Sequence, residues 1–88
     1  VLTLEGTPGG RFVLQPGATV VIGRSLQADV SVDDLRVSRR HCEIQHGDRG
    51  VVVADLRSAN GTFVNGQRIT KALLRPGDRL QVGNADLK

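Results

Sequence analysis

The close spacing of turn residues constrains this chain more than any other feature of its sequence. Turn signals recur throughout the 88 residues, for example at Pro16-Gly17, Asn60-Gly61 and Pro76-Gly77-Asp78. The segments between these turns are short and rich in Val, Ile and Leu. Short β-branched segments between regular turns are typical of a β-sandwich or a β-barrel. The sequence therefore predicts an all-β fold.

Short extended segments fill the spaces between these turns. The strongest local signal is Asn65-Gly66, which separates two segments by two residues, as a type I′ hairpin turn requires. Between Arg24 and His46 a weak helical face competes, but the apolar residues mostly lie an even number of positions apart, which favours strand and loop. The predicted strands are Val1–Leu4, Arg11–Leu14, Thr19–Ile22, Val30–Val32, His41–Gln45, Val51–Asp55, Thr62–Val64, Gln67–Ile69 and Arg79–Val82.

The composition excludes several classes of binding protein. The chain has two Phe and no Trp or Tyr, so it lacks the aromatic side chains of a base-stacking nucleic-acid binder or a methyl-lysine cage. Twelve basic residues against nine acidic ones leave a net charge of +3, and ten of the twelve are Arg. Because guanidinium groups bind phosphate or carboxylate through two hydrogen bonds at once, this balance favours an acidic partner.

The length corresponds to one small domain, and we expect residues 1–88 to form it. A single cysteine, Cys42, excludes an internal disulfide, so packing must stabilise the fold. No segment reaches the roughly 20 apolar residues of a membrane-spanning helix, and the N-terminus does not resemble a signal peptide. We therefore expect a cytoplasmic, monomeric domain. Because the chain does not begin with Met, we expect it to be part of a longer protein.

Three predicted loops carry similar chemistry. Gly23-Arg24-Ser25 follows one strand, Val37-Ser38-Arg39-Arg40-His41 leads into another, and Arg57-Ser58-Ala59-Asn60-Gly61-Thr62 follows a third. Each combines a hydroxyl group with a guanidinium or amide group, and these are the donors that a phosphate dianion needs. Because the loops of a sandwich gather at its ends, these three can converge on one anion-binding site.

These segments, in this order and spacing, resemble the forkhead-associated (FHA) domain. The resemblance extends to Asp55-Leu56 before the third segment, to Phe63-Val64-Asn65-Gly66 after it, and to Pro76-Gly77-Asp78-Arg79-Leu80-Gln81-Val82-Gly83. It implies a two-sheet β-sandwich of about ten to eleven short strands. It also implies a module that binds phosphothreonine peptides in signalling, with no enzymatic activity and no cofactor or metal.

The resemblance implies a role for each matching residue. Arg24 and Ser38 are expected to bind the phosphate, Ser38 through both its hydroxyl group and its main-chain amide. Arg39 is expected to supply a second basic contact. Gly23 and His41 are expected to support the site, Gly23 by allowing a tight turn and His41 by tying the loops together as a buried ring.

A second group of residues would contact the peptide chain. Asn60 is expected to hydrogen-bond the peptide main chain, with Ser58 beside it and Gly61 supporting the loop. Asn65 is expected either to hold the peptide or to serve only its own turn. Arg36 would read the residue three places after the phosphothreonine, which would then be acidic.

Two features depart from the family pattern. Ala59 stands where many relatives carry Thr or Ser, so one phosphate contact fewer is expected. After Val82-Gly83 only five residues remain, so the final edge strand of the family is expected to be missing.

Other functions compete with this interpretation. A zinc site at His41, Cys42 and His46 is disfavoured because adjacent strand residues point to opposite faces. Ser58, His41 and Asp55 are the residue types of a catalytic triad, but the Gly-x-Ser-x-Gly pattern of a nucleophile elbow is absent. Two alternatives stay open: an FHA fold that binds independently of phosphorylation, and a basic nucleic-acid-binding β domain. The modest charge and the interspersed acidic residues disfavour the second.

Overall fold

The computed structural model describes residues 2–5, 11–48, 50–83 and 85–87, and side chains within 11–48 and 50–83. The described residues form eleven strands joined by turns and loops, with no helix among them and hence none that could span a bilayer. The strands are β1 (Leu2–Glu5), β2 (Arg11–Leu14), β3 (Thr19–Gly23), β4 (Val30–Ser31), β5 (Cys42–Gly47), β6 (Gly50–Asp55), β7 (Thr62–Val64), β8 (Gln67–Ile69), β9 (Lys71–Leu74), β10 (Leu80–Val82) and β11 (Ala85–Leu87).

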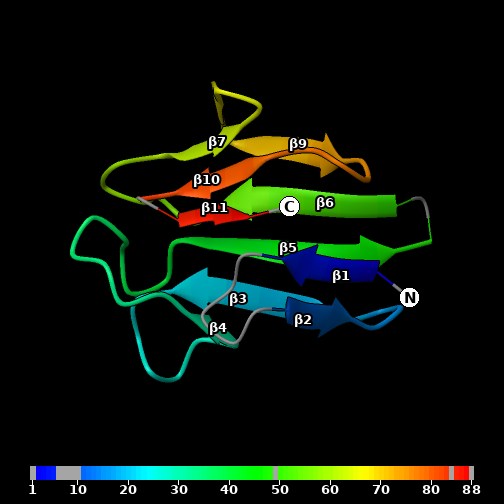
Figure 1. The fold of residues 1–88 in the computed structure, drawn as a ribbon, viewed down its shortest axis with the longest axis horizontal. Coiled ribbons are helices and arrows are strands. Elements are labelled where there is room, and N and C mark those ends of the chain that lie inside the picture. The colour runs from blue at the N-terminus through cyan, green and yellow to red at the C-terminus, as the bar shows by residue number, and fades with distance from the viewer. Residues whose placement is uncertain (1, 6–10, 49, 84, 88) are drawn as a thin grey trace.

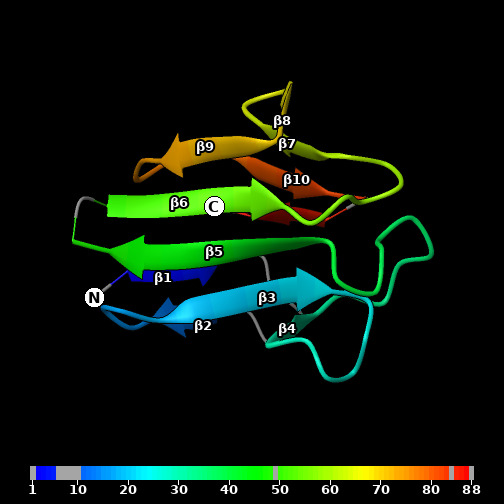
Figure 2. The same ribbon diagram turned by 180° about the vertical axis from the view of Figure 1, so that it is seen from behind.

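The strands form two layers. One layer is the five-stranded sheet β4-β3-β5-β6-β9, which is antiparallel apart from the parallel pair of β3 and β4. The antiparallel pair β1-β2 and the four-stranded sheet β11-β10-β7-β8 lie on the same face of the larger sheet. Figures 1 and 2 show this arrangement from opposite sides. The prediction of an all-β, two-layer sandwich is confirmed.

Alternation along the strands places the core between the layers. In β3, Val20 and Ile22 are buried, whereas Thr19 is exposed. Because successive side chains of a strand point to opposite faces, strands such as β3, β5, β6, β7 and β10 give alternate residues to the core. The buried apolar residues are Leu14, Val20, Ile22, Val30, Val32, Val37, Cys42, Ile44, Val51, Val53, Val64, Leu80 and Val82.

Each of the nine predicted strands corresponds to an observed strand, with ends that differ by at most two residues. Val1 lies outside the described residues. The hairpin prediction is confirmed, because Asn65 and Gly66 have φ angles of 51° and 84° and Val64 pairs with Gln67. The stretch from Arg24 to His46 consists of strand and loop, as its apolar spacing predicted.

Two observed strands were not predicted. β9 consists of Lys, Ala and Leu, which have low β propensity, and it forms because it pairs with β6 at the edge of the larger sheet. The expectation that the final edge strand is missing is wrong. Ala85–Leu87 forms β11, and each of its three residues pairs with a residue of β10.

Three connections meet at one end of the sandwich. They are the β3–β4 loop (residues 24–29), the β4–β5 loop (residues 32–41) and the β6–β7 loop (residues 56–61). Because β5 is antiparallel to both β3 and β6, β5 begins where the other two strands end. Figure 1 shows the three loops at the left-hand end of the larger sheet. We call this end of the molecule the loop edge.

The Cys42 thiol provides a test of the core. Cys42 has no exposed surface, and burial raises its pKa to about 12, although a hydrogen bond with Thr62 opposes the rise. Since the thiolate is the reactive species, we expect the folded protein to resist a thiol reagent such as DTNB at pH 8. Full reaction is expected in denaturant, measured by absorbance. Rapid labelling of the folded protein would contradict the buried position of Cys42.

Candidate functional site

Gly23 brings the first two loops into main-chain contact. The Arg24 N–H donates to the Ser38 carbonyl oxygen at 2.9 Å. The next N–H, that of Ser25, donates to the Arg39 carbonyl oxygen at 3.2 Å. A Cβ atom on residue 23 would lie 2.0 Å from that same Arg39 oxygen, far inside van der Waals contact. Only glycine therefore allows the β4–β5 loop to pass this close to the end of β3.

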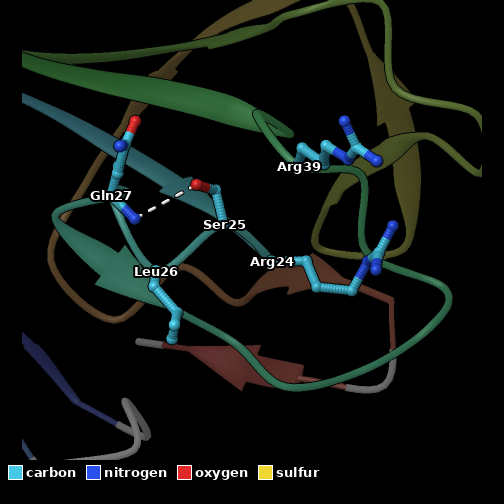
Figure 3. Close-up of a pocket in the computed structure, with 5 residues that line it drawn as sticks. All are labelled: Arg24, Ser25, Leu26, Gln27 and Arg39. Atoms are coloured by element: carbon cyan, nitrogen blue, oxygen red, sulfur yellow. Dashed lines mark hydrogen bonds between the residues drawn. The ribbon is translucent and has the colours of Figure 1, made fainter.

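Two arginines share an open pocket at this junction. The pocket is lined by Arg24, Ser25, Leu26, Gln27 and Arg39. Figure 3 shows the Arg24 and Arg39 side chains extending to the same side of the pocket. The Arg24 Nε donates to the Val37 carbonyl oxygen at 3.0 Å, which fixes the guanidinium group. Its Nη donors have no partner within the described residues, so they remain available to an anion.

A buried histidine connects the second and third loops. His41 has no exposed surface, and its Nδ1 accepts a hydrogen bond from the Ser38 N–H at 3.1 Å. Its Nε2 lies 2.7 Å from the Gly61 carbonyl oxygen. Because a carbonyl oxygen only accepts, we assign the proton to Nε2, and the neutral ring then satisfies both partners. With both nitrogens occupied, His41 holds the loops together and offers no atom to a metal or a substrate.

Ser38 presents its hydroxyl group to the loop edge, but not its main-chain amide. The Ser38 N–H is directed at His41, which contradicts the expectation that this amide binds phosphate. The Ser38 Oγ accepts a hydrogen bond from the Ala59 N–H at 3.1 Å, so its own proton is left to be donated. The N–H of Arg39 has no acceptor within the described residues. This main-chain donor is therefore left for a ligand, whereas the Ser38 amide is not.

Asn60 and Arg36 form the far side of the site. The Asn60 Nδ2 donates to the Arg36 carbonyl oxygen at 2.8 Å. This contact fixes the amide group and leaves its Oδ1 free to accept a hydrogen bond from a ligand. The Arg36 side chain lies 3.8 Å from Asp34, measured from Nε to Oδ1. The positive charge of Arg36 is therefore partly balanced within the protein.

Asp55, which the sequence analysis did not assign to the site, organises the β6–β7 loop. Its carboxylate accepts hydrogen bonds from the Ser58 N–H, the Ser58 hydroxyl group and the Thr62 hydroxyl group at 3.1, 2.5 and 2.7 Å. The Ser58 Oγ also accepts from the Gly61 N–H at 3.1 Å, and Ser58 is buried. These contacts show Ser58 supporting its own loop, the more frequent role of this serine, and none of them points to a peptide. An Asp three residues before a Ser is typical of a side chain that caps a turn, and this signal was present in the sequence.

Asn65 lies away from the loop edge. It follows β7, whereas Gly61 precedes it, which separates the two by about 13 Å at the usual rise of a strand. The Asn65 side chain donates to Asp78 and accepts from the Arg79 N–H, at 3.1 and 3.0 Å. These contacts and its positive φ assign Asn65 to the hairpin turn. The structure does not bring it to the loop edge, where Asn60 and Arg36 lie.

The donors at the loop edge suit an anion. Besides the Asn60 Oδ1, the side-chain and main-chain groups left for a ligand are the Arg24 Nη atoms, the Ser38 hydroxyl group, and the N–H and side chain of Arg39, and these are donors. Within the described residues no three His, Cys, Asp or Glu side chains lie close enough to hold a metal ion. A tetrahedral dianion offers several acceptor oxygens to such a set of donors.

The hydrogen bonds of Asp55 predict a dependence of stability on pH. Burial alone would raise the pKa of the Asp55 carboxyl group, but hydrogen bonds from Ser58 and Thr62 outweigh it and lower the pKa below its ordinary value of 3.8. The stability that Asp55 contributes is therefore present above pH 4 and is lost as the pH falls through the lowered pKa. We expect Asp55→Asn to reduce the free energy of unfolding at pH 7 by about 1–3 kcal/mol.

The measurement is denaturant unfolding at pH 7 and near pH 2. The difference between wild type and Asp55→Asn should shrink at the acid pH, because the stability that the Asp55 charge contributes is lost as the pH falls through the lowered pKa. Asp48→Asn is the matched control, because Asp48 is exposed in the β5–β6 turn at the opposite end of the sheet. A difference that is equally large at both pH values would contradict a role for the Asp55 charge.

Comparisons with known proteins agree with this arrangement. The family profile of the FHA domain matches residues 20–83. The chain is 45% identical over 74 residues to the ABC transporter ATP-binding/permease protein of Mycobacterium tuberculosis, covering 84% of this chain but only 8% of the transporter. Two solved structures are also similar. One, from a study of phosphothreonine-dependent FHA domain interactions, has a TM-score of 0.87 and 34% identity, covering 97% of this chain and 90% of that one.

The other structure is Mycobacterium tuberculosis EmbR in complex with a low-affinity phosphopeptide. It has a TM-score of 0.89 and 31% identity, and the match covers 98% of this chain and 23% of EmbR. The family match includes Gly23, all three loops of the loop edge and the β7–β8 hairpin. This chain therefore belongs to the FHA domain family.

Proposed function

We propose that this domain binds phosphothreonine-containing segments of partner proteins and so mediates a phosphorylation-dependent interaction in signalling. The observation that carries the proposal is the convergence of three loops whose unpaired groups are mostly donors, with Arg24, Ser38 and Asn60 fixed by contacts between the loops. The EmbR structure, which contains a phosphopeptide, supports the same use of the fold. The proposal is one of binding without catalysis, because no part of it needs a nucleophile or a base.

The phosphate would be bound by Arg24, Ser38 and Arg39. A phosphothreonine carries about −1.5 to −2 charges at pH 7, and each hydrogen bond to a charged group contributes about 1.5–3 kcal/mol. Two or three such bonds give roughly 4–8 kcal/mol, before the cost of association. Micromolar affinity needs about 8 kcal/mol net. The phosphate alone is therefore not enough, and contacts with the peptide main chain must add to it.

In this proposal Asn60 would supply those contacts. Its Nδ2 is held by Arg36, and its free Oδ1 can accept a hydrogen bond from a peptide N–H. Ala59 brings no hydroxyl group, and its main-chain N–H is used to orient Ser38. The proposed ligand would thus be bound at two points. Its phosphate would contact the β3–β4 and β4–β5 loops, and its main chain would contact Asn60.

The first test removes the guanidinium group of Arg24. We expect Arg24→Ala to lower the affinity for a phosphothreonine peptide selected from a degenerate library by more than about tenfold. Arg24→Lys should also weaken binding, because a point charge replaces a planar pair of donors. The measurement is isothermal titration calorimetry, with Arg75→Ala as control, since Arg75 lies in the β9–β10 turn away from the loop edge.

The outcomes separate the proposal from its alternatives. Unphosphorylated peptide should bind at least about a hundredfold more weakly, as expected when several charge-assisted hydrogen bonds are lost. Equal binding of both peptides would favour an interaction that is independent of phosphorylation. Binding of duplex DNA with a steep dependence on salt would favour the nucleic-acid alternative.

The second test concerns the main-chain contact. We expect Asn60→Ala to weaken phosphopeptide binding by about tenfold, the effect of one to two hydrogen bonds, and to leave the weak binding of inorganic phosphate nearly unchanged. Calorimetry with both ligands measures the difference, and a melting curve checks that the variant is folded. If Asn60→Ala lowered the affinity for both ligands equally, Asn60 would belong to the phosphate site and not to a separate contact.

A further inference from the structure

Arg68 lies on the outer face of the smaller sheet, directly behind the β6–β7 loop. Thr62 and Val64 of β7 are buried, so Phe63 between them faces outwards. Arg68 of β8 pairs with Phe63 across the hairpin, and cross-strand partners share a face of the sheet. The Arg68 side chain therefore stands on the outer face, and it is exposed.

The Arg68 side chain leans towards the loop edge and covers Gly61. A Cβ atom on residue 61 would lie 2.8 Å from the Arg68 Nε and 3.1 Å from its Cζ. The guanidinium group thus occupies the space that any side chain at position 61 would fill. Gly61 directly follows Asn60, so this places a positive charge on the Asn60 side of the site.

The loop beneath Arg68 is firmly held. The Gly61 N–H donates to the Ser58 Oγ, and the Gly61 carbonyl oxygen accepts a hydrogen bond from the His41 Nε2–H. These two contacts fix the backbone on which the Arg68 side chain rests. The hydrogen bonds of Gly61 thus fix the surface against which the exposed Arg68 side chain lies.

Arg68 and Arg36 differ in their charge environment. The Arg36 guanidinium lies beside Asp34, whose carboxylate also accepts the Arg36 N–H. Within residues 11–48 and 50–83, the Arg68 side chain forms neither an ion pair nor a hydrogen bond. An acidic ligand group would therefore meet a partly balanced charge at Arg36 and an unbalanced one at Arg68.

We propose that Arg68 is a specificity-determining residue that binds an acidic side chain of the partner where its chain passes Asn60 and Gly61. This inference rests on the proposed function and adds a partner chemistry to it: a phosphothreonine accompanied by a nearby Asp or Glu. The residue expected from the sequence to recognise an acidic side chain of the partner was Arg36, and we now propose Arg68 for this role. Gly61 has a second role in this arrangement, because it leaves room for the guanidinium group.

The expected preference is modest and sensitive to salt. An exposed ion pair contributes up to about 1 kcal/mol, which corresponds to about a fivefold change in affinity. Charges at an exposed site are screened as the ionic strength rises. We therefore expect Glu to be favoured over Gln about two- to fivefold at low salt, and much less in 0.5 M NaCl.

The experiment is a double-mutant cycle between protein and peptide. A series of phosphothreonine peptides carries a single Glu, or a Gln in its place, at successive positions on either side of the phosphothreonine. Each is titrated into the wild type, Arg68→Gln, Arg36→Gln and the control Arg75→Gln. We expect one position, or two neighbouring ones, at which the wild type prefers Glu. That preference should disappear in Arg68→Gln and persist in the other two variants, while melting curves show that all four proteins are folded.

Each other outcome overturns the inference in a distinct way. If phosphopeptides bind but Glu and Gln bind equally at every position, or if the preference persists in Arg68→Gln, Arg68 does not read the ligand. Loss of the preference in Arg36→Gln alone would return the role to Arg36. If no phosphothreonine peptide binds the wild type, the proposed function fails, and the role of Arg68 fails with it.

Discussion

The site depends on the buried imidazole of His41, which joins two loops that the chain order keeps twenty residues apart. Its two nitrogens face opposite kinds of partner, a donor at Ser38 and an acceptor at Gly61, and only the neutral ring serves both. The close approach of the β4–β5 loop to Gly23 attaches the third connection, the β3–β4 loop. Together these contacts fix three flexible connections relative to a rigid sheet, and the positions of Arg24, Ser38 and Asn60 follow from them.

The internal hydrogen bonds of the loops also determine what is left for a ligand. Several acceptors at the loop edge already accept hydrogen bonds within the protein. The Val37 and Arg36 carbonyl oxygens accept from the Arg24 and Asn60 side chains. The Asp55 carboxylate accepts from the Ser58 and Thr62 hydroxyl groups. The groups that stay unpaired are mostly donors, which suits an anion and disfavours a cation. Since the Arg24 and Ser38 side chains are held by hydrogen bonds before any ligand arrives, their binding loses little side-chain entropy.

The sequence predicted most of the fold and only part of the site. Turn residues and apolar alternation located nine strands, since both are local signals, whereas β9 and β11 form because of the strands they pair with. The same division applies to the site. The family pattern indicated Arg24, Ser38 and Asn60, but the direction of the Ser38 amide depends on His41. The position of Arg68 over Gly61 depends on a cross-strand register, and no local pattern shows either.

The main-chain contacts between the loops have a consequence for how such a domain can diverge. The bonds from the Arg24, Ser25 and Leu56 amides to the Ser38, Arg39 and His41 carbonyl groups use no side-chain atom. Exposed residues such as Leu26, Gln27 and Leu35 can therefore be exchanged without disturbing the framework that carries them. A lineage, or a designed library, could vary these positions to reach new partners while the loop geometry is inherited unchanged.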